Sequence, residues 1–149
     1  MSDQRPNWDQ YFMSIAHTVS ERASCNRRKC GVVLVSPEHR IVSTGYNGAP
    51  AGWDDCLSTG CELDDQGHCI RTIHSELNAV ITAAKHGIST DHTTAYIYGA
   101  PPCPKCALLL AQAGIKVVYY QGDYHTYDGP IILEQHGIPV YDMLPTQND

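Results

Sequence analysis

Two short motifs restrict the folds open to this chain more than any other part of its sequence. One is His74-Ser75-Glu76 and the other is Pro102-Cys103-Pro104-Lys105-Cys106, each at the start of an expected helix. In the first turn of a helix, residues three apart face the same side, so the sulfurs of Cys103 and Cys106 point in one direction. Zinc prefers nitrogen and thiolate ligands, and three protein ligands leave its fourth tetrahedral position open. The fold must therefore bring these two helix starts together.

The two motifs predict a catalytic zinc bound by His74, Cys103 and Cys106, with Glu76 beside the metal. Residues two apart diverge around a helix, so the Glu76 carboxylate cannot easily reach the position that His74 occupies. Next to the metal it can take a proton from water and deliver it to the substrate. The alternative for Glu76 is a carboxylate that only stabilises its helix N-terminus.

Apolar spacing predicts a helix and a hairpin in the N-terminal part of the chain. The apolar residues from Trp8 to Val19 follow one stripe of a helix, and Asn7 is a good N-cap for it. Two β-rich runs at 32–35 and 41–43 are joined by a short polar segment, which is typical of a β-hairpin. This part of the sheet is therefore expected to be antiparallel.

Strands and helices alternate in the C-terminal half of the sequence. The expected elements are a helix at 74–86, a strand at 93–98, a helix at 107–111, a strand at 115–120, a helix at 131–136 and a strand at 138–141. Short strand-helix-strand connections imply right-handed crossovers and parallel pairing. We therefore expect an α/β fold with a mixed sheet and helices on both faces, in one domain spanning residues 1–149.

The amino-acid composition of the chain argues against proteins that bind nucleic acids or span membranes. The 149 residues carry a formal net charge of −6, and 42% of them are apolar. A negative chain lacks the basic face that broad binding to nucleic-acid backbones requires. No apolar run approaches the roughly 18 residues needed to cross a membrane, and residues 1–6 have no signal-peptide core. The expectation is a cytoplasmic protein that acts on a small substrate, with no nucleic-acid or membrane partner.

The remaining cysteines predict a second metal site. Seven cysteines cannot all be paired in disulfides, and a reducing cytoplasm would not keep them paired. Residues 47–72 form a long segment with little apolar content to order it. A closed structural zinc in this Cys-rich insertion would order it, with four candidate ligands: Cys25, Cys56, Cys61 and Cys69. His68 replacing Cys61 or Cys69 is the rival ligand set, and unrelated free thiols are the other alternative. Cys30 is expected to be a core residue.

At these motifs the chain resembles the zinc-dependent cytidine and deoxycytidylate deaminases, specifically the deoxycytidylate (dCMP) deaminases of phage and bacterial type. The resemblance covers about residues 16–141. It is carried by Lys29-Cys30-Gly31-Val32-Val33, Thr44-Gly45-Tyr46-Asn47-Gly48-Ala49-Pro50, His74-Ser75-Glu76-Leu77-Asn78-Ala79, Pro102-Cys103-Pro104-Lys105-Cys106 and Ala113-Gly114-Ile115-Lys116-Val117-Val118-Tyr119. The Gly-Tyr-Asn-Gly-x-Pro segment separates this subfamily from deaminases of free nucleosides, guanine and tRNA adenosine.

This resemblance implies a three-layer α/β/α sandwich of the cytidine deaminase type around five strands. The implied reaction is hydrolytic deamination of dCMP to dUMP and ammonia, which supplies pyrimidine deoxynucleotides for dTMP synthesis. Relatives are commonly hexamers activated by dCTP and inhibited by dTTP, with Mg²⁺ as a companion of these nucleotides, and often carry a second zinc. Two alternatives stay open. One is a deaminase of cytidine, deoxycytidine or tRNA adenosine, and the other is a zinc-stabilised binding module without catalysis.

The resemblance also suggests roles for residues around the zinc. Asn47 matches a position that contacts the sugar or nucleotide, although an Asn before Gly is also a common turn former. Ser75 and Pro101 depart from the usual Ala and Ser at places that contribute mainly backbone contacts to the base. Lys85 lies where relatives place a basic residue linked to effectors, and its alternative role is to complement the helix dipole.

A nucleotide substrate also requires a cation for its phosphate. The only dense basic cluster contains Arg22, Arg27, Arg28 and Lys29, and we take Arg27 as the phosphate ligand. A solvated basic turn is the alternative. Tyr120 ends a strand at the sheet edge where ligands gather in α/β folds, so it is expected to contact the phosphate or the base. The alternative for Tyr120 is a buried tyrosine at the end of the sheet.

Overall fold

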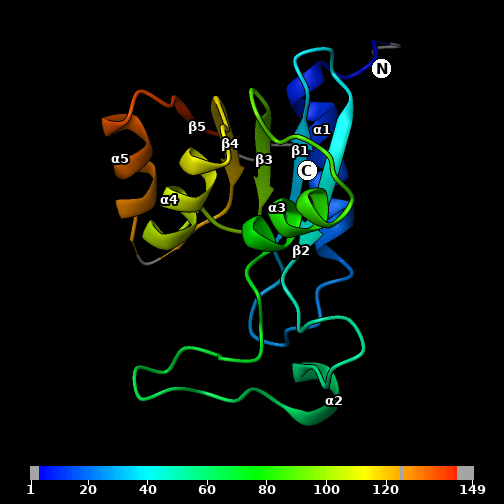
Figure 1. Cartoon of the computed structure of the whole chain (residues 1–149), viewed down its shortest axis with the longest axis vertical. Helices are drawn as coiled ribbons and strands as arrows, with labels where there is room; N and C mark the ends of the chain where they lie inside the picture. The colour runs from blue at the N-terminus through cyan, green and yellow to red at the C-terminus, as the bar shows by residue number, and fades with distance from the viewer. Residues whose placement is uncertain (1–3, 125, 144–149) are drawn as a thin grey trace.

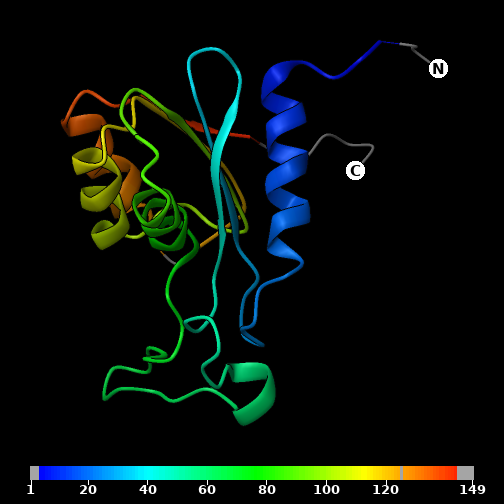
Figure 2. The same ribbon diagram turned by 45° about the vertical axis from the view of Figure 1, so that its right-hand side comes forward.

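The chain forms one mixed five-stranded sheet between two helical layers, in a computed structural model that describes residues 4–124 and 126–143. Residues 1–3, 125 and 144–149 of the expected domain lie outside this description. The helices are α1 (Trp8–Ser20), α2 (Cys56–Thr59), α3 (Ser75–Lys85), α4 (Pro104–Gln112) and α5 (Asp128–Gln135). The strands are β1 (Gly31–Val35), β2 (Ile41–Tyr46), β3 (Thr94–Tyr98), β4 (Val117–Gln121) and β5 (Val140–Asp142). Helix α1 covers one face of the sheet, and α3, α4 and α5 cover the other (Figures 1 and 2), which confirms the expected sandwich.

The strand order is β2-β1-β3-β4-β5. Strand β1 pairs antiparallel with β2, and β3, β4 and β5 are parallel, as the sequence predicts. The structure adds an antiparallel pairing of β1 with β3. In this register Gly31 lies opposite both Tyr46 and Tyr98, and Tyr98 lies opposite Gln121. These four residues mark one end of the sheet, here called the loop end, where β1 begins and β2, β3 and β4 finish. The segments that follow or precede them are therefore neighbours in space.

The core has one apolar layer on each face of the sheet. Strand β1 is buried along its whole length because its side chains alternate between the two layers. Val32 and Leu34 pack under α3 and α4, while Val33 and Val35 pack under α1. Glycines allow the helices to lie this close. A Cβ on Gly45 of β2 would overlap the backbone of α3, just as one on Gly31 of β1 would overlap that of α1.

Two helices begin earlier than the apolar pattern predicts. Helix α4 starts at Pro104 rather than 107, with Cys103 as its N-cap, and α5 starts at Asp128 rather than 131. The first turn of each contains proline or polar residues, which fit a helix start but carry no apolar periodicity. No helix within the described ranges combines the length and the apolar character needed to cross a membrane.

The Cys-rich insertion extends beyond the loop end, away from the sheet (Figure 1). It contains more structure than the expected loop: helix α2, held by a capping box between Asp55 and Ser58, and a β-bridge between Leu63 and Cys69. Its two ends are tied together, because Gly48 and Ile73 exchange backbone hydrogen bonds of 3.1 and 2.9 Å. The chain thus leaves β2 and returns directly to the start of α3.

The close approach of α3 to β2 gives a prediction about stability. A Gly45→Ala substitution forces the added methyl group against the α3 backbone, which cannot give way as a flexible side chain would. We expect the free energy of unfolding, measured by urea denaturation, to fall by about 1–3 kcal/mol. The neighbouring Thr44 is exposed, so Thr44→Ala should change it by no more than about 0.5 kcal/mol. Equal stability of the two variants would contradict the packing.

Candidate metal centre

The starts of α3 and α4 meet at one point and bring three metal-ligand atoms together. His74 Nδ1 lies 3.6 Å from the Sγ of Cys103 and 3.4 Å from the Sγ of Cys106. A tetrahedral zinc with bonds of about 2.3 Å to sulfur and 2.0 Å to nitrogen separates such atoms by about 3.5 Å. The donor set therefore has the spacing that zinc requires, and three donors leave a fourth position for a small molecule.

The local sequence explains why these ligands face one another. His74 and Cys103 are the N-caps of their helices, with extended backbone angles that turn each side chain toward the helix end. Cys106 lies one turn into α4, and its backbone N–H donates to Cys103 Sγ. The positive end of each helix favours anionic ligands there. Both helix starts thus contribute to the same electropositive site.

The pKa values of the two cysteines are shifted in opposite directions. The Cys106 thiol hydrogen-bonds to Cys103, which lowers the pKa of Cys103 to about 4 and raises the pKa of Cys106. The hydrogen bond to Cys103 also raises the pKa of His74. A divalent cation bound by all three side chains would take the place of these protons, because metal ligands are deprotonated.

Glu76 lies beside this set and is held by its neighbour. Its side chain is 7% exposed, and its Oε1 accepts a 2.6 Å hydrogen bond from the Ser75 hydroxyl. The negative charge of Glu76 helps to raise the pKa of Cys106, so the carboxylate lies near the metal ligands. It is not one of the three groups whose donor atoms lie within 4.8 Å of one another. The contact from Ser75 was not foreseen in the sequence, where only a backbone role was considered.

Four cysteines gather at a second point, inside and next to the insertion. The sulfurs of Cys25, Cys56 and Cys61 lie within 4.8 Å of one another, and Cys69 Sγ is 3.4 Å from Cys56 Sγ. His68 is directed elsewhere, because its ring lies 3.9 Å from the Asp64 carboxylate with 67% of the side chain exposed. The structure thus brings the four-cysteine set together and leaves the rival histidine outside it.

The surroundings of Cys69 favour a thiolate. Burial opposes its ionisation, but hydrogen bonds from the Arg71 backbone, the Thr72 hydroxyl and the Cys56 thiol outweigh burial and lower its pKa to about 6. A thiolate among three other sulfurs is the chemistry of a closed, four-coordinate zinc site. This second set differs from the first, which offers only three donors.

Other residues singled out in the sequence lie in three different settings. Asn47 is buried at the loop end, where its Oδ1 accepts from Cys30 N (2.8 Å) and its Nδ2 donates to the Arg28 carbonyl (2.7 Å). Tyr120 is packed in the core layer under α3, α4 and α5. Lys85 is the last residue of α3, at the opposite end of the helix from His74.

Arg27 is turned toward the insertion. Its Nη1 donates to the carbonyl of Gly67 at 3.0 Å, and its backbone N–H contacts the sulfur of Cys25 at 3.4 Å. Spacing in the sequence placed Arg27 in a basic cluster but gave no signal for the direction of its side chain. In the structure it joins the second sulfur cluster to the insertion.

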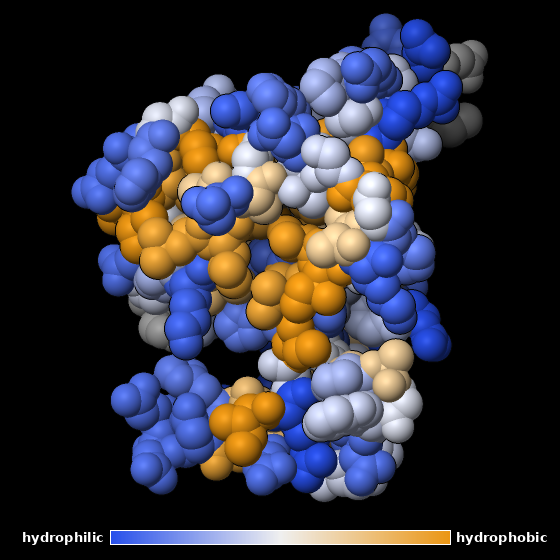
Figure 3. Space-filling view, in the orientation of Figure 1, coloured by the Kyte–Doolittle hydropathy of each residue, from blue (hydrophilic) through white to orange (hydrophobic). Residues whose placement is uncertain are grey.

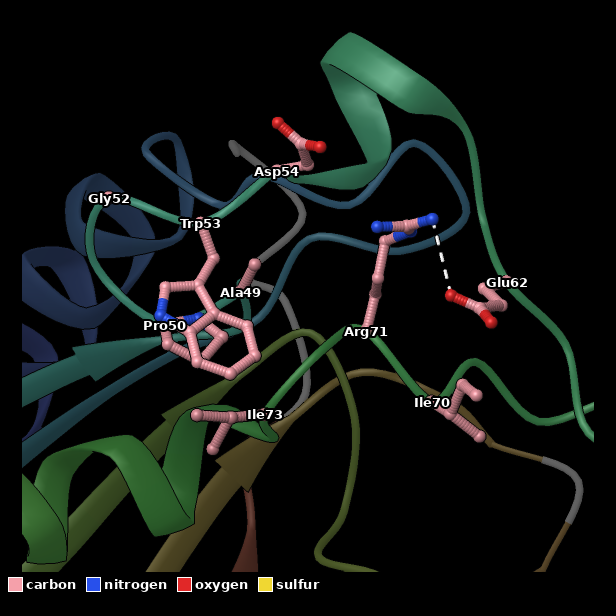
Figure 4. Close-up of a pocket in the computed structure, with 9 residues that line it drawn as sticks. All are labelled: Ala49, Pro50, Gly52, Trp53, Asp54, Glu62, Ile70, Arg71 and Ile73. Carbon is pink, nitrogen blue, oxygen red and sulfur yellow. Dashed lines mark ion pairs between the residues drawn. The ribbon is translucent and has the colours of Figure 1, made fainter.

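A cavity of about 550 Å³ lies between the insertion and the start of α3 (Figure 4). The Trp53 ring, 73% exposed, lies near Pro50 and Ile73, while Arg71 and Glu62 form a 3.2 Å ion pair elsewhere in the lining. Ile73 directly precedes His74 in the chain, but His74, Cys103 and Cys106 are not among the residues that line the cavity. Sequence analysis did not single out Trp53, since an isolated tryptophan in an aperiodic segment carries no motif.

Comparisons with known proteins agree with this geometry. The zinc-binding region of the cytidine and deoxycytidylate deaminase family matches residues 6–121. ComE operon protein 2 of Bacillus subtilis is 40% identical over 92% of this chain and 71% of its own length. The deoxycytidylate deaminase of Schizosaccharomyces pombe is 33% identical over 97% of this chain but 46% of its own length, so this chain spans about half of it. The crystal structure of dCMP deaminase from the cyanophage S-TIM5, in complex with dCMP and dUMP, has a TM-score of 0.82 at 34% identity, covering 94% of this chain and 99% of that one.

The first ligand set gives a prediction about metal content. Replacing His74 by alanine removes one of three donors, so the His74→Ala protein should contain one zinc fewer per chain than the wild type by elemental analysis. His86, at the other end of α3, provides a matched control because its ring Nδ1 only contacts the Thr82 carbonyl. The His86→Ala protein should keep its zinc. Unchanged zinc in His74→Ala would remove this residue from the ligand set.

Proposed function

This chain belongs to the family of zinc-dependent cytidine and deoxycytidylate deaminases, and we propose that it catalyses the hydrolytic deamination of dCMP to dUMP and ammonia. The observation that carries the proposal is the set of three zinc donors with the Glu76 carboxylate beside it. Three donors leave a position for the water that a hydrolytic reaction needs, which a closed structural site does not. The dCMP deaminases among the relatives support this substrate.

Zinc, when bound, supplies a Lewis acid that makes water nucleophilic at neutral pH. His74, Cys103 and Cys106 would hold it at the starts of α3 and α4. Glu76 moves two protons: it accepts one from water and delivers it to the ring nitrogen next to the reacting carbon, and it then transfers the remaining proton of the added hydroxyl to the amino group. The C–N bond breaks as the carbonyl forms, and the amino group leaves as ammonia. The Ser75 hydroxyl donates to Oε1 of Glu76 and so fixes the orientation of the carboxylate.

Finer aspects of the function rest mainly on the resemblance. They are activation by dCTP and inhibition by dTTP with Mg²⁺, the supply of dUMP for dTMP synthesis, the contacts of Asn47 and Tyr120 with substrate, and the link of Lys85 to effectors. The placement of Asn47 at the loop end supports its role, because the metal ligands lie at the same end of the sheet. A cytoplasmic location is supported by seven cysteines that are all free thiols in the structure.

We propose that the chain forms a homo-oligomer, which exposed apolar side chains support, and that the oligomer is a hexamer, which rests on the resemblance alone. Figure 3 shows an apolar area on the face that α3 and α4 present, and Ile81, Leu108 and Leu109 of these helices are exposed. Contiguous apolar surface of this kind marks interaction sites in soluble proteins. Sedimentation velocity measures the assembly, and a monomer at micromolar concentration would rule it out.

We also propose that Cys25, Cys56, Cys61 and Cys69 bind a second, structural zinc. The convergence of the four sulfurs supports it, as does the scarcity of apolar contacts in the insertion. Within the single domain that we propose for residues 1–149, this zinc would order residues 47–72. Because those residues enter α3 through Ile73, the structural zinc also stabilises the chain next to the catalytic ligands.

The catalytic proposal is tested by a spectrophotometric assay of dCMP and deoxycytidine, with and without dCTP and dTTP. We expect dCMP to be preferred by at least about 100-fold in kcat/KM, since a site that binds phosphate rejects the nucleoside. The Glu76→Gln variant should lower kcat by about 10²–10⁴-fold while it keeps its zinc. Turnover of deoxycytidine equal to that of dCMP would contradict the substrate, and full activity of Glu76→Gln would contradict the mechanism.

The structural zinc is tested by a pair of neighbouring substitutions. Cys69→Ser should reduce the zinc content from two to one per chain, while His68→Ala should leave it at two. Losing a structural zinc removes several kcal/mol, so we expect Tm to fall by about 5–15 °C in Cys69→Ser. The reverse pattern, with zinc lost only from His68→Ala, would favour the rival ligand set. A wild-type content of one zinc would rule out the second site.

A further inference from the structure

Helix α5 begins in direct contact with the backbone that carries the metal ligand Cys103. A Cβ atom on Gly129, the second residue of α5, would overlap the carbonyl group of Pro102 and lie 3.1 Å from the carbonyl carbon of Cys103. Gly129 is buried and the Pro102 side chain is fully buried, so this contact belongs to the interior of the protein. The helix and the turn that carries the ligand therefore meet backbone to backbone.

Three helix starts meet around Cys103. Helices α4 and α5 follow the parallel strands β3 and β4, so both begin at the loop end of the sheet, and they pack side by side (Figures 1 and 2). The start of α3 reaches Cys103 through a side chain, because His74 Nδ1 lies 3.6 Å from the Cys103 sulfur. Cys103 thus contacts α3 through its side chain and α5 through its backbone.

Helix α5 is anchored and cannot easily move away from this contact. Leu133 is 0% exposed in the core layer beneath α3, α4 and α5. The first turn of α5 is held by the Ile131 N–H, which donates to the Tyr127 carbonyl at 3.3 Å. Pro102, by contrast, belongs to the connection between β3 and α4. An atom added between α5 and Pro102 would therefore displace the connection rather than the helix.

A displacement of Cys103 would change the geometry of the metal ligands. The Cys103 carbonyl accepts from the Ala107 N–H at 2.9 Å, and its sulfur accepts from the Cys106 N–H at 3.5 Å. The backbone of Cys103 thus determines both the start of α4 and the position of the sulfur. Because metal–ligand distances in zinc sites vary by only about 0.2 Å, a shift of this size in the Cys103 backbone is enough to misplace its sulfur.

We propose that Gly129 is a positioning residue of the catalytic metal centre. Because Gly129 has no side chain, α5 packs directly on the Pro102–Cys103 peptide and fixes the Cys103 sulfur at the distance from His74 that zinc requires. Gly129 acts through the backbone of Cys103, and the proposal rests on the catalytic zinc proposed above. Groups that hold a metal ligand in place typically change the metal affinity by about 10- to 100-fold when they are altered.

The test compares Gly129→Ala with Gly31→Ala, which adds the same methyl group against the backbone of α1, on the other face of the sheet. Each variant is titrated with Co²⁺, whose absorption reports its bonds to thiolates, and then with zinc in competition. The signal of His74→Ala, which keeps the second ligand set, is subtracted so that only the first set is measured.

Gly129→Ala should weaken metal binding to the first ligand set by about 10- to 100-fold and shift the thiolate absorption band of Co²⁺. Gly31→Ala should keep the affinity within about threefold and leave the band unchanged, because its added methyl group lies far from the ligands. Both variants should unfold at lower urea concentration than the wild type, so a loss of stability alone would not distinguish them.

Hydrogen exchange tests the same coupling without a substitution in α5. If α5 fixes Cys103, metal bound at Cys103 must in turn stabilise the start of α5, because coupling between two sites is reciprocal. The amides of the first turn of α5, including Ile131, should exchange at least about threefold more slowly in the zinc-loaded wild type than in His74→Ala. The amides of α1 around Ala16 should exchange equally in both proteins. This measurement decides the question if Gly129→Ala does not fold.

The outcomes separate this proposal from the proposed function. If the wild type binds neither zinc nor Co²⁺ through His74, Cys103 and Cys106, the catalytic metal site itself fails. If the wild type binds metal there but Gly129→Ala keeps its affinity and its absorption band, Gly129 has no positioning role. The proposal is also overturned if Gly31→Ala weakens the metal site as much as Gly129→Ala does, or if α5 exchanges equally in the wild type and His74→Ala.

Discussion

The structure depends on the contact between the N-termini of α3 and α4. His74 and Cys103 are separated by 29 residues, yet their ligand atoms lie 3.6 Å apart. Each helix directs the positive end of its dipole at the same point, which repels the other unless negative charge lies between them. The two cysteine sulfurs and the Glu76 carboxylate supply that charge, and a divalent cation bound by His74, Cys103 and Cys106 would hold the two helix starts together. The sheet places the two helix starts next to each other. Helix α4 follows β3 in the chain, and α3 follows β2 and the insertion.

The sequence was most informative where backbone geometry restricts a side chain. Cys103 and Cys106 are three residues apart at a helix start, so their common direction follows from helix geometry alone. The strands and their pairing followed from apolar alternation and short connections, and the structure confirms them. By contrast, the apolar pattern alone places the starts of α4 and α5 three residues too late, because a first turn built from proline and polar residues leaves no apolar periodicity. For α4 the cysteine motif indicated the correct start, since Cys103 is its N-cap.

The sequence was least informative about long or isolated side chains. The sequence gives no reason to distinguish Arg27 from Arg28, which are adjacent. In the fold, Arg27 donates to the Gly67 carbonyl and Arg28 donates to the Asp123 carbonyl, so their side chains point in different directions. The Ser75 hydroxyl that holds Glu76 was missed for a related reason: its role depends on a rotamer rather than on residue type. The four-cysteine cluster could be anticipated because cysteines in a segment poor in apolar residues have few other roles.

The two ligand sets differ in the number of donor atoms that they offer to a metal ion, and the chain that joins them connects the insertion to the start of α3. The first is limited to three donors, so it has room for a reacting molecule, whereas the second has four sulfurs and excludes one. The insertion that holds the second set returns to α3 through the paired backbones of Gly48 and Ile73. Since Ile73 directly precedes His74, any loosening of the insertion is transmitted to a catalytic ligand through one peptide unit. The structural zinc that we propose for the second set would therefore hold the segment that leads into the first set.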